Sequence, residues 1–462
     1  MLDPLYTADE MRAAEEGHDV AALMERAGRA VAAHVLERYP DARRVTAVCG
    51  GGANGGDGRI AAGALREEGR EVLVVEAAPE EEPKDLGEPD VVVDALFGTG
   101  FSGVPREGAA RLIEQMNECG APVVAVDLPS GVDASTGEVA GAAVRAALSV
   151  SFHGPKVGHH VGPGRAHTGE VVTADIGLPP SLTAARLVTA DVLRLVPRRG
   201  PEDNKYTAGS VLVVGGSQGM SGAVCLCASA AFRADAGYVA VAAPESVMPI
   251  VEIRVLEAVK RPCPEDASGL LTEASAEIVL ELAEKAGAVA LGPGLGRSDR
   301  TRQLVRELLD ELSLPVVLDA DGLWALEQLD RAAPTVLTPH AGELARLLDR
   351  ETEWVNAHRL GAAVLAAERF GCTVLLKGAD TIVASAGHGP LVVDVPVPAL
   401  ATAGTGDVLT GVIAAFLAKD VEPSLAAAAA AVAHARAGAL ADAGAGLVAG
   451  DVVEALPLAL AE

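Results

Sequence analysis

The chain has 462 residues, enough for two or three domains, because a typical domain contains about 100 to 200 residues. Half of the residues are hydrophobic but only 3% are aromatic, so we expect cores packed mainly with Val, Leu and Ala. A formal net charge of −27 disfavours nucleic acid and anionic membranes as partners, because both repel an acidic protein. Small anionic ligands are still compatible with this charge where backbone amides bind them.

The sequence begins without the basic and apolar segments of a secretory signal, and no uninterrupted apolar stretch of about 18 residues follows. Six cysteines are scattered along the chain without the paired spacing of a metal site, and they are few for a disulfide scaffold of this length. We therefore expect a cytoplasmic protein with reduced thiols and no membrane partner.

The first 180 residues predict helices that alternate with short apolar strands. Residues 7–38 are expected to be helical with a break at Gly17, because Thr7 and Glu10 form a capping-box pattern and apolar residues follow at helical spacing. Further helices are expected at residues 61–68 and 109–119, and Val-rich strands at residues 45–48, 72–75, 91–93, 123–126 and 171–176. Continuous apolar strands separated by helices are typical of a parallel sheet covered on both faces.

A second α/β region follows a segment rich in proline and charge. Residues 177–180 and 197–204 place a domain boundary near residues 180–204. Beyond it, strands are expected at residues 211–214, 239–242, 289–291, 316–318, 335–337 and 374–376. The sequence therefore predicts two α/β domains in series, residues 1–185 and 186–462.

A glycine-rich loop follows the strand at residues 45–48 and leads into a helix. Gly50, Gly52 and Gly55 match the dinucleotide-binding pattern G-x-G-x-x-G, and Glu76 ends a later strand, about where a ribose-binding acid would lie. Taken in isolation, this pattern is compatible with an NAD-dependent dehydrogenase or with a simple tight turn.

Polar side chains lie in this loop and after two further strands of the first domain. Asn54 and Asp57 are not needed for phosphate binding by backbone amides, and Asp94, Asp127 and Ser130 lie at or after the later strand ends. The carboxyl ends of parallel strands converge on one crevice, so we expect these five residues to share a site. For each Asp alone, a helix cap or a loop salt bridge is the alternative.

The second domain contains a different candidate for phosphate binding. None of the seven lysines is followed by Ser or Thr, which excludes the loop of P-loop NTPases. Gly404, Thr405 and Gly406 instead precede an apolar helix, and their amides predict an anion-binding site at its N terminus. Asp407 follows directly and is a candidate general base, although an Asp in a first helical turn also interacts with the helix dipole.

Other loops of the second domain supply context for this site. Lys377 ends the strand at residues 374–376 and can neutralise phosphate charge. His340 follows a proline before the next helix, where helix capping and ligand contact are alternatives. Glycine-rich turns at residues 215–222 and 291–296 also let the backbone approach a ligand closely.

These motifs together resemble those of a known family. GANGGDG at residues 52–58, DALFGTG at 94–100 and VDLPSG at 126–131 look like an NAD(P)H-hydrate epimerase domain. Five motifs of the second domain resemble those of a ribokinase-like NAD(P)H-hydrate dehydratase: GGS at 215–217, GPGLG at 292–296, TPH at 338–340, KGADT at 377–381 and GTGD at 404–407. Their order is that of the bifunctional NAD(P)H-hydrate repair enzyme family. The resemblance implies an N-terminal Rossmann-like three-layer α/β domain and a C-terminal ribokinase-like three-layer α/β domain.

This family repairs nicotinamide cofactors that have been hydrated on the reduced ring. The resemblance implies that the first domain interconverts the R and S epimers of the hydrates, NADHX and NADPHX. The second domain would dehydrate the S epimer to NAD(P)H, with ADP as co-substrate and release of AMP and phosphate. The chain is accordingly expected to be a lyase and an isomerase that binds NAD(P)HX and ADP or AMP, uses Mg²⁺ and K⁺, and forms a homo-oligomer.

The matching motifs imply site residues in the first domain. Asn54, Asp94 and Ser130 would bind K⁺, and Asp127 is the candidate acid or base. The hydrate would be contacted by Ala53, Asn54, Gly55, Gly56, Asp57, Gly98, Thr99, Gly100, Phe101, Ser102, Gly103, Val104 and Asp127.

The matching motifs also imply site residues in the second domain. Asp407 would take the proton from the ring hydroxyl, while the anion site and Lys377 stabilise the transferred phosphoryl group. The hydrate-binding site would be lined by Ala223, Gly294, His340 and Asp407. The adenine nucleotide would be bound by Lys377, Gly378, Ala379, Asp380, Thr381 and Gly406.

Two residues depart from the family pattern. Ala53 replaces the first Asn of the epimerase loop and removes one side-chain amide. Ala403 stands where the family commonly has Gly, which matters only if that position needs a positive φ. Two other functions stay open at this point: a ribokinase-like kinase of a small alcohol with a regulatory first domain, and a non-catalytic nucleotide sensor.

Overall fold

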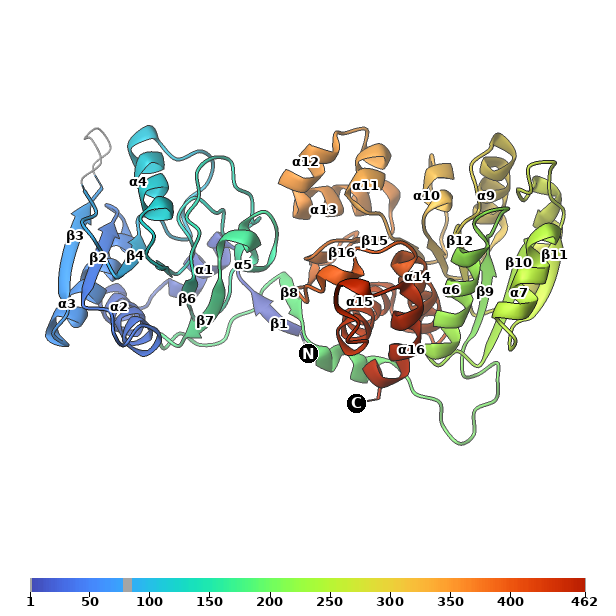
Figure 1. Cartoon of the computed structure of the whole chain (residues 1–462), viewed down its shortest axis with the longest axis horizontal. Helices are drawn as coiled ribbons and strands as arrows, with labels where there is room; N and C mark the ends of the chain where they lie inside the picture. Colours follow the sequence, from blue (N-terminus) through green and yellow to red (C-terminus); the bar gives the residue numbers. More distant parts are fainter. Residues whose placement is uncertain (1, 78–84, 462) are drawn as a thin grey trace. The chain divides into compact units, whose positions relative to one another are not determined.

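The computed structural model describes residues 2–77 and 85–461, and the chain divides into two compact units. The first unit is formed mainly by Pro4–Arg186, and the second mainly by Leu187–Val355 and Gly361–Glu462. Both units contain a sheet with helices packed against it, so the predicted α/β class is confirmed (Figure 1). The domain limits of residues 1–185 and 186–462 stay a prediction.

The first unit is built on a six-stranded sheet in the order β3-β2-β4-β5-β6-β7, and its neighbouring strands are parallel. The strands are β2 (Arg44–Cys49), β3 (Glu71–Glu76), β4 (Val91–Ala95), β5 (Val123–Val126), β6 (Leu148–Phe152) and β7 (Glu170–Ala174). The helical segments are α1 (Ala8–Glu15), α2 (Val20–Arg38), α3 (Ala53–Glu67), α4 (Glu107–Glu118), α5 (Val157–His160) and η1 (Gly164–His167).

Helices cover both faces of this sheet. Val45 and Ala47 of β2 pack with side chains of α2 and α3, whereas Val48 packs with Leu112 and Ile113 of α4. Alternate residues of one strand therefore contribute to two separate hydrophobic clusters, which is the pattern of a three-layer arrangement.

Strand β6 was not predicted from the sequence. This strand reads Leu-Ser-Val-Ser-Phe, and its two serines are buried although they are polar. Ser149 donates to the carbonyl oxygen of Thr168 and Ser151 to that of Gly154, so their hydroxyl groups are satisfied inside the protein. The predicted helix break at Gly17 is confirmed, because Gly17 has φ +82° between α1 and α2.

The second unit is built on an eleven-stranded sheet in the order β1-β8-β17-β16-β15-β14-β13-β12-β9-β10-β11. Strands from β15 to β11 pair in parallel, whereas β16 is antiparallel to both β15 and β17. The strands are β1 (Leu2–Leu5), β8 (Ala185–Val188), β9 (Ser210–Val214), β10 (Tyr238–Pro244), β11 (Val259–Cys263), β12 (Ala288–Leu291), β13 (Val316–Leu318), β14 (Thr335–Leu337), β15 (Thr373–Leu376), β16 (Thr381–Ser385) and β17 (Leu391–Val393).

The helices α6, α7, α8, α14 and α15 contact the strands of this second sheet. The helices of the unit are α6 (Ser221–Arg233), α7 (Met248–Arg254), α8 (Ala276–Ala283), α9 (Asp299–Glu311), α10 (Asp321–Ala325), α11 (Ala341–Leu348), α12 (Thr352–Ala357), α13 (Arg359–Phe370), α14 (Thr405–Leu417), α15 (Pro423–Leu440) and α16 (Ala449–Ala459). Short 3-10 helices connect them: η2 (Ala190–Leu195), η3 (Glu245–Val247), η4 (Glu273–Ser275), η5 (Pro398–Leu400) and η6 (Gly444–Gly446).

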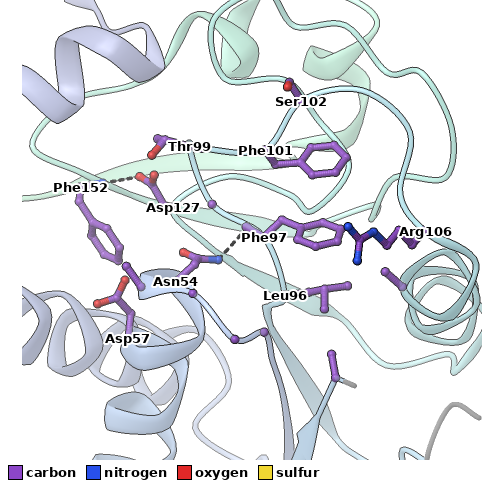
Figure 2. A pocket seen from close by; sticks show the side chains of 18 of the residues that line it. Asn54, Asp57, Leu96, Phe97, Thr99, Phe101, Ser102, Arg106, Asp127 and Phe152 are labelled. Carbon is purple, nitrogen blue, oxygen red and sulfur yellow. Dashed lines mark hydrogen bonds between the residues drawn. The ribbon is translucent and has the colours of Figure 1, made fainter. Parts of the chain in front are cut away.

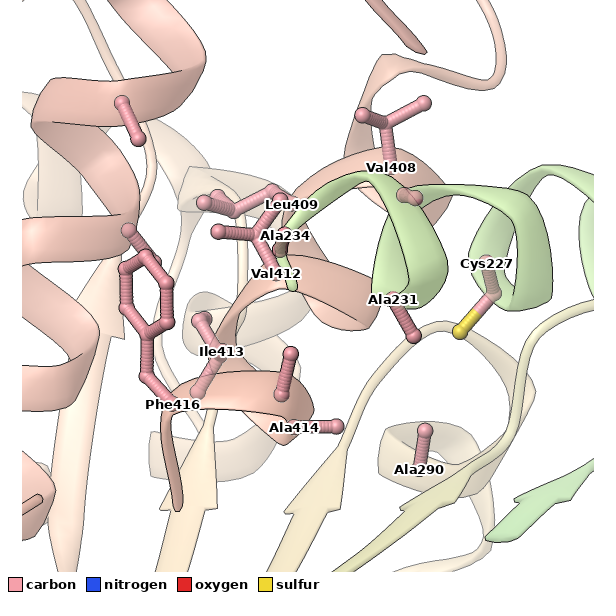
Figure 3. Close-up of a cluster of buried hydrophobic side chains, with 14 of the residues drawn as sticks. Cys227, Ala231, Ala234, Ala290, Val408, Leu409, Val412, Ile413, Ala414 and Phe416 are labelled. Carbon is pink, nitrogen blue, oxygen red and sulfur yellow. The ribbon is translucent and has the colours of Figure 1, made fainter. Parts of the chain in front are cut away.

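Small side chains dominate the core of the second unit. Figure 3 shows α6 and α14 packed together over the sheet, with Ala231 and Cys227 on α6 and Ala414 on α14. A Cβ atom on Gly411 of α14 would lie only 2.2 Å from the carbonyl oxygen of Cys227, so the backbones of the two helices touch. This close packing fixes α14, whose N terminus bears the predicted anion site.

Within residues 2–77 and 85–461, no helix has the length and apolar character needed to cross a membrane.

Candidate functional site

A cavity of about 680 Å³ lies at the carboxyl ends of β2, β4 and β5 in the first unit (Figure 2). It is lined by ten of the residues predicted from the sequence: Ala53, Asn54, Asp57, Gly98, Thr99, Gly100, Phe101, Ser102, Val104 and Asp127. Five predicted residues do not line it: Gly55, Gly56, Asp94, Gly103 and Ser130.

The glycines of the first loop allow close backbone packing. A Cβ atom on Gly50 would lie 2.0 Å from the carbonyl oxygen of Leu96, and one on Gly55 would lie 1.9 Å from that of Gly50. A Cβ atom on Gly56 would meet the sulfur of Met24 at 2.6 Å. Gly55 and Gly56 therefore bring α3 against its neighbours, and the loop is shorter than predicted because α3 already begins at Ala53.

Asp57 lies in the first turns of α3, where it is only 9% exposed. Burial, together with the charges of Asp127 and Glu15, raises its pKa to about 8. Asp57 therefore holds a proton at neutral pH and can donate it to a ligand in the cavity.

Asp127 follows β5 and has the left-handed φ of +67°, which is uncommon for a residue other than glycine. Its Oδ1 atom accepts hydrogen bonds from the Lys156 ammonium group and, at 3.1 Å, from the backbone amide of Phe152. Lys156 is completely buried and also donates to the carbonyl oxygen of Phe152 at 2.8 Å. The His159 ring lies 2.8 Å from the carbonyl oxygen of Asp127, and burial lowers the pKa of His159 well below its usual value.

Asn54, Asp94 and Ser130 meet around the backbone of Phe97. Asn54 donates to the Phe97 carbonyl at 2.7 Å, and the Phe97 amide donates to the Ser130 hydroxyl at 2.8 Å. The Ser130 hydroxyl donates to Asp94 at 2.6 Å. Asp94 is fully buried, and this burial raises its pKa to about 6 although hydrogen bonds from Ser130 and Leu96 lower it.

Sequence reasoning missed several residues around the first cavity. Lys156, Glu15 and Phe97 received no role, yet Lys156 pairs with Asp127, Glu15 adds a third carboxyl group, and Phe97 stacks on Phe101 at 4.6 Å between ring centroids. Lys156 is one of seven lysines in the chain and lies four residues after β6. Recognition of β6 would have placed it at the same sheet edge as Asp127.

A second cavity, of about 650 Å³, lies in the second unit beside the N terminus of α14. Five of the six predicted nucleotide-binding residues line it: Lys377, Gly378, Ala379, Thr381 and Gly406. Asp380, the sixth, is buried and does not line the cavity. The rest of the wall is mostly apolar, with Val393, Val397, Leu400, Leu409 and Ala431 among its residues.

The N terminus of α14 provides amides for an anion. Gly404 is its N-cap residue with φ +90°, and Gly406 is open on the side of Lys377, whose Nζ atom would lie 3.5 Å from an added Cβ. Positive φ at this turn therefore falls on Gly404, and Ala403 is not among the described residues with positive φ. The alanine at position 403 is thus compatible with the turn.

Asp407 lies in the first turn of α14. Burial and the negative charges of Asp319 and Asp321 raise its pKa, the charge of Lys377 lowers it, and the result is a pKa of about 7. A carboxyl group of this kind is suited to accept a proton at neutral pH.

Lys377 follows β15 and is held in place by Asp319, which follows β13. The Lys377 Nζ atom lies 3.0 Å from Asp319 Oδ1 and 3.8 Å from Glu343. The Thr410 hydroxyl donates to Asp319 Oδ2 at 2.7 Å. Burial raises the pKa of Asp319, but the Lys377 charge and these hydrogen bonds bring it below its usual value, so Asp319 stays ionised.

The three other predicted hydrate-binding residues divide between two places. His340 lines the second cavity and also caps α11, since its Nδ1 atom accepts from the amides of Gly342 and Glu343 at 3.1 and 3.3 Å. The capping alternative considered for His340 is therefore confirmed, and its contact with a ligand stays a prediction. Ala223 and Gly294 lie together away from this cavity, because a Cβ atom on Gly294 would lie 3.0 Å from that of Ala223.

Asp319 is the main residue that sequence reasoning missed in the second unit. It directly follows the predicted strand at residues 316–318, in the same position as the polar residues that were selected after other strands. Its position at a strand end was the available signal. Thr410 lay hidden inside an apolar helix and gave no such signal.

Comparison with known proteins identifies both halves of the chain. Residues 211–457 match the family described as NAD(P)H-hydrate dehydratase, and residues 20–88 and 76–158 match the YjeF-related protein N-terminus family. The bifunctional NAD(P)H-hydrate repair enzyme of Moorella thermoacetica is 37% identical over 95% of this chain and 92% of its own length. The enzyme of that name from Escherichia coli is 34% identical over 93% of this chain and 88% of its own length.

Solved structures resemble the second unit. The ADP/ATP-dependent NAD(P)H-hydrate dehydratase from Bacillus subtilis, co-crystallised with ATP and Mg²⁺, is 29% identical with a TM-score of 0.51, covering 59% of this chain and 96% of its own. A ribokinase-like protein from Enterococcus faecalis has a TM-score of 0.53 at 23% identity, covers 61% of this chain and 98% of its own, and supports the ribokinase-like fold. The chain therefore belongs to the family of bifunctional NAD(P)H-hydrate repair enzymes.

Proposed function

We propose that this protein repairs hydrated NADH and NADPH through two activities. The first unit interconverts the R and S epimers of NAD(P)HX, and the second dehydrates the S epimer to NAD(P)H while ADP is converted to AMP and phosphate. The observation that carries this proposal is Asp407, a buried carboxyl group with a pKa of about 7, beside the amides of α14 and the Lys377 ammonium.

The second cavity supports adenine-nucleotide binding. Its apolar wall suits an adenine ring, and Lys377, Gly378, Ala379, Thr381 and Gly406 would face the phosphates, with Asp380 buried behind them. A Mg²⁺ ion on the phosphates fits the nearby carboxylates of Asp319 and Glu343, because Mg²⁺ combines one or two carboxylates with phosphate oxygens.

Dehydration follows from these positions. The ionised Asp407 removes the proton from the ring hydroxyl, and the hydroxyl oxygen attacks the terminal phosphoryl group of ADP, which releases AMP. Lys377 and the amides at Gly404–Gly406 stabilise the transferred phosphoryl group. The C–O bond then breaks with the electron pair leaving on phosphate, and loss of a proton from the neighbouring ring carbon restores the double bond. Ala223, Gly294 and His340 would line the site that holds the hydrate.

Epimerisation belongs to the first cavity. Its glycine-lined wall and the stacked rings of Phe97 and Phe101 fit the partly apolar ring of the hydrate. Asp127 is held rigidly by Lys156 and Phe152 and would act as acid or base at the hydroxyl-bearing carbon. Residues 53–57 and 98–104 would contact the hydrate, except that Gly55, Gly56 and Gly103, which do not line the cavity, would act by positioning the backbone of their neighbours.

A potassium site at Asn54, Asp94 and Ser130 fits the chemistry of these residues. They present amide, carboxylate and hydroxyl oxygens within one hydrogen-bonded group around Phe97. Burial disfavours the charged form of Asp94, and a bound cation would offset that cost. The ion would hold the loop of Phe97 against the start of α3.

The cytoplasmic location and the homo-oligomer stay predictions. Light scattering of the purified protein measures the oligomeric state, and a molar mass of one chain would contradict the oligomer.

Recovery of NADH absorbance tests the two activities together. Purified protein is incubated with a mixture of R- and S-hydrated NADH, Mg²⁺ and K⁺, with ADP, with ATP or without nucleotide. We expect full recovery of NADH with ADP together with release of AMP and phosphate. Absence of recovery with either nucleotide would overturn the proposal, and a stable phosphorylated product would indicate a small-molecule kinase instead.

A further inference from the structure

Two carboxyl groups of the first cavity differ sharply in their surroundings. Asp57 projects from α3 and Asp127 from the turn after β5, and both side chains point into the same cavity (Figure 2). Asp57 faces two further carboxyl groups, those of Glu15 in α1 and Asp127, whereas Asp127 contacts the Lys156 ammonium directly. Unequal surroundings of this kind separate an acid from a base in many active sites.

Asp57 is placed to donate a proton. It is only 9% exposed, and burial with the charges of Asp127 and Glu15 raises its pKa to about 8. Burial of Glu15 raises the pKa of its own carboxyl group. The negative charge of Asp127 raises that pKa further, and the positive charge of Lys156 lowers it.

Asp127 is placed to accept a proton. The Lys156 ammonium and the Phe152 amide both donate to its Oδ1 atom, which leaves Oδ2 for a ligand in the cavity. Lys156 is fixed in turn by hydrogen bonds to the Ser151 hydroxyl at 3.1 Å and the Phe152 carbonyl at 2.8 Å. The positive charge of Lys156 compensates the carboxylate inside the protein.

The chemistry of the hydrate calls for both groups. Addition of water to an enamine places the hydroxyl on the carbon next to nitrogen, because the nitrogen lone pair stabilises positive charge there. Inversion at this carbon needs an acid to protonate the departing hydroxyl and a base to deprotonate a water molecule that returns on the other face.

Resting on the epimerase function proposed above, we propose that Asp57 is the catalytic acid and Asp127 the catalytic base of epimerisation, with Lys156 as the positioning residue for Asp127. Asp57 protonates the hydroxyl, the C–O bond breaks with its electron pair on the departing water, and the nitrogen lone pair forms a C=N⁺ bond. Water then attacks the opposite face of that carbon and gives its proton to Asp127. Exchange with solvent water returns the proton to Asp57.

The first test compares the full-length protein with Asp57→Asn. Purified R-hydrated NADH is incubated without nucleotide, and the two epimers are separated by chromatography. The variant should lower kcat at least about 100-fold with little change in KM, because Asn keeps the shape of Asp57 but cannot act as an acid. A kcat within about ten-fold of the wild type would overturn the proposal. No conversion by the wild type would overturn the epimerase function itself.

Glu15→Gln is the matched variant, since it removes one negative charge beside Asp57 and leaves the acid and the base in place. The pKa of Asp57 should fall, so the upper limb of the pH–rate profile should move to lower pH by about 0.5 to 1 unit. A merely structural role for Asp57 would leave that limb unmoved, and this result would also overturn the proposal.

Bond breaking is followed in water enriched in ¹⁸O. Each inversion should place one ¹⁸O atom in the product epimer, because the original hydroxyl leaves as water. Inversion with retention of the original oxygen would indicate a ring-opening route and would contradict the proposed step.

Discussion

Asp407 lies in the first turn of α14, where burial and the charges of Asp319 and Asp321 raise its pKa to about 7. A general base works only when it has lost its proton, so protonation below this pKa removes the active form. We expect kcat for dehydration of the S hydrate to rise with pH through about 7 and then to level off. The profile is measured by NADH formation with saturating ADP; a rate independent of pH between about 5 and 9 would contradict the assignment.

Removal of the Asp319 charge should move this profile. Asp319→Asn keeps the side-chain shape but eliminates a negative charge that raises the pKa of Asp407 and that pairs with Lys377. Both effects lower the pKa of Asp407, so the rising limb should shift to lower pH by about one unit. Asp349→Asn is the control, because Asp349 ends α11 on the surface and should leave the limb where it is.

The predictability of individual residues followed their distance from partners in the sequence. Asp127 and Asp407 could be selected because each stands directly after a strand or a glycine turn that is visible locally. Lys156 received no role because β6 was not predicted and its partner Asp127 lies 29 positions away. Asp319 was missed although it directly follows a predicted strand, and its pairing with Lys377, 58 positions away, depends on strand order. The pKa values of Asp57 and Asp407 likewise depend on burial by residues that are distant in the sequence.

At the scale of elements, the N terminus of α14 depends on one residue in the left-handed region. Gly404 has φ +90°, and an added Cβ would lie 2.8 Å from the Leu226 side chain. Gly404→Ala should therefore destabilise the second unit by about 1–2 kcal/mol and raise the KM for ADP, because the amides that face the phosphates shift.

Ala403→Gly is the matched control for that substitution. It changes the neighbouring residue, whose φ is not positive, and should alter stability by less than about 1 kcal/mol. Urea denaturation and ADP-dependent kinetics measure both variants. Equal effects of the two substitutions would contradict the role given to Gly404.

The central parallel strands were predictable because they are continuous runs of Val, Ala and Leu bounded by glycine or charge. Strand β6 escaped because its alternating serines mask its burial, and their compensation by Thr168 and Gly154 is visible only in three dimensions. Strands β16 and β17 are short and antiparallel, β1 and β11 are the edge strands of the larger sheet, and β8 lies next to β1. Such strands owe their conformation to pairing more than to their own composition.

At the scale of the whole molecule, each proposed reaction uses residues of one unit only. Asp127→Asn should lose epimerisation and Asp407→Asn should lose dehydration, each by about 10²- to 10⁴-fold. An equimolar mixture of the two variants should convert the R hydrate to NADH with ADP at about half the wild-type rate. NADH absorbance measures this recovery after subtraction of uncatalysed epimerisation, and a mixture as slow as either variant alone would contradict separate sites.

The core formed with α6, α14 and α15 consists largely of Ala and Val, so little side-chain volume can be taken away from it. Substitutions that remove side-chain atoms usually destabilise a core, but here few atoms can be removed at each position. Added atoms are the danger, because even a methyl group on Gly411 would collide with the Cys227 carbonyl. Random mutation therefore threatens this half of the protein by enlargement, and natural selection must remove the substitutions that add atoms rather than those that delete them.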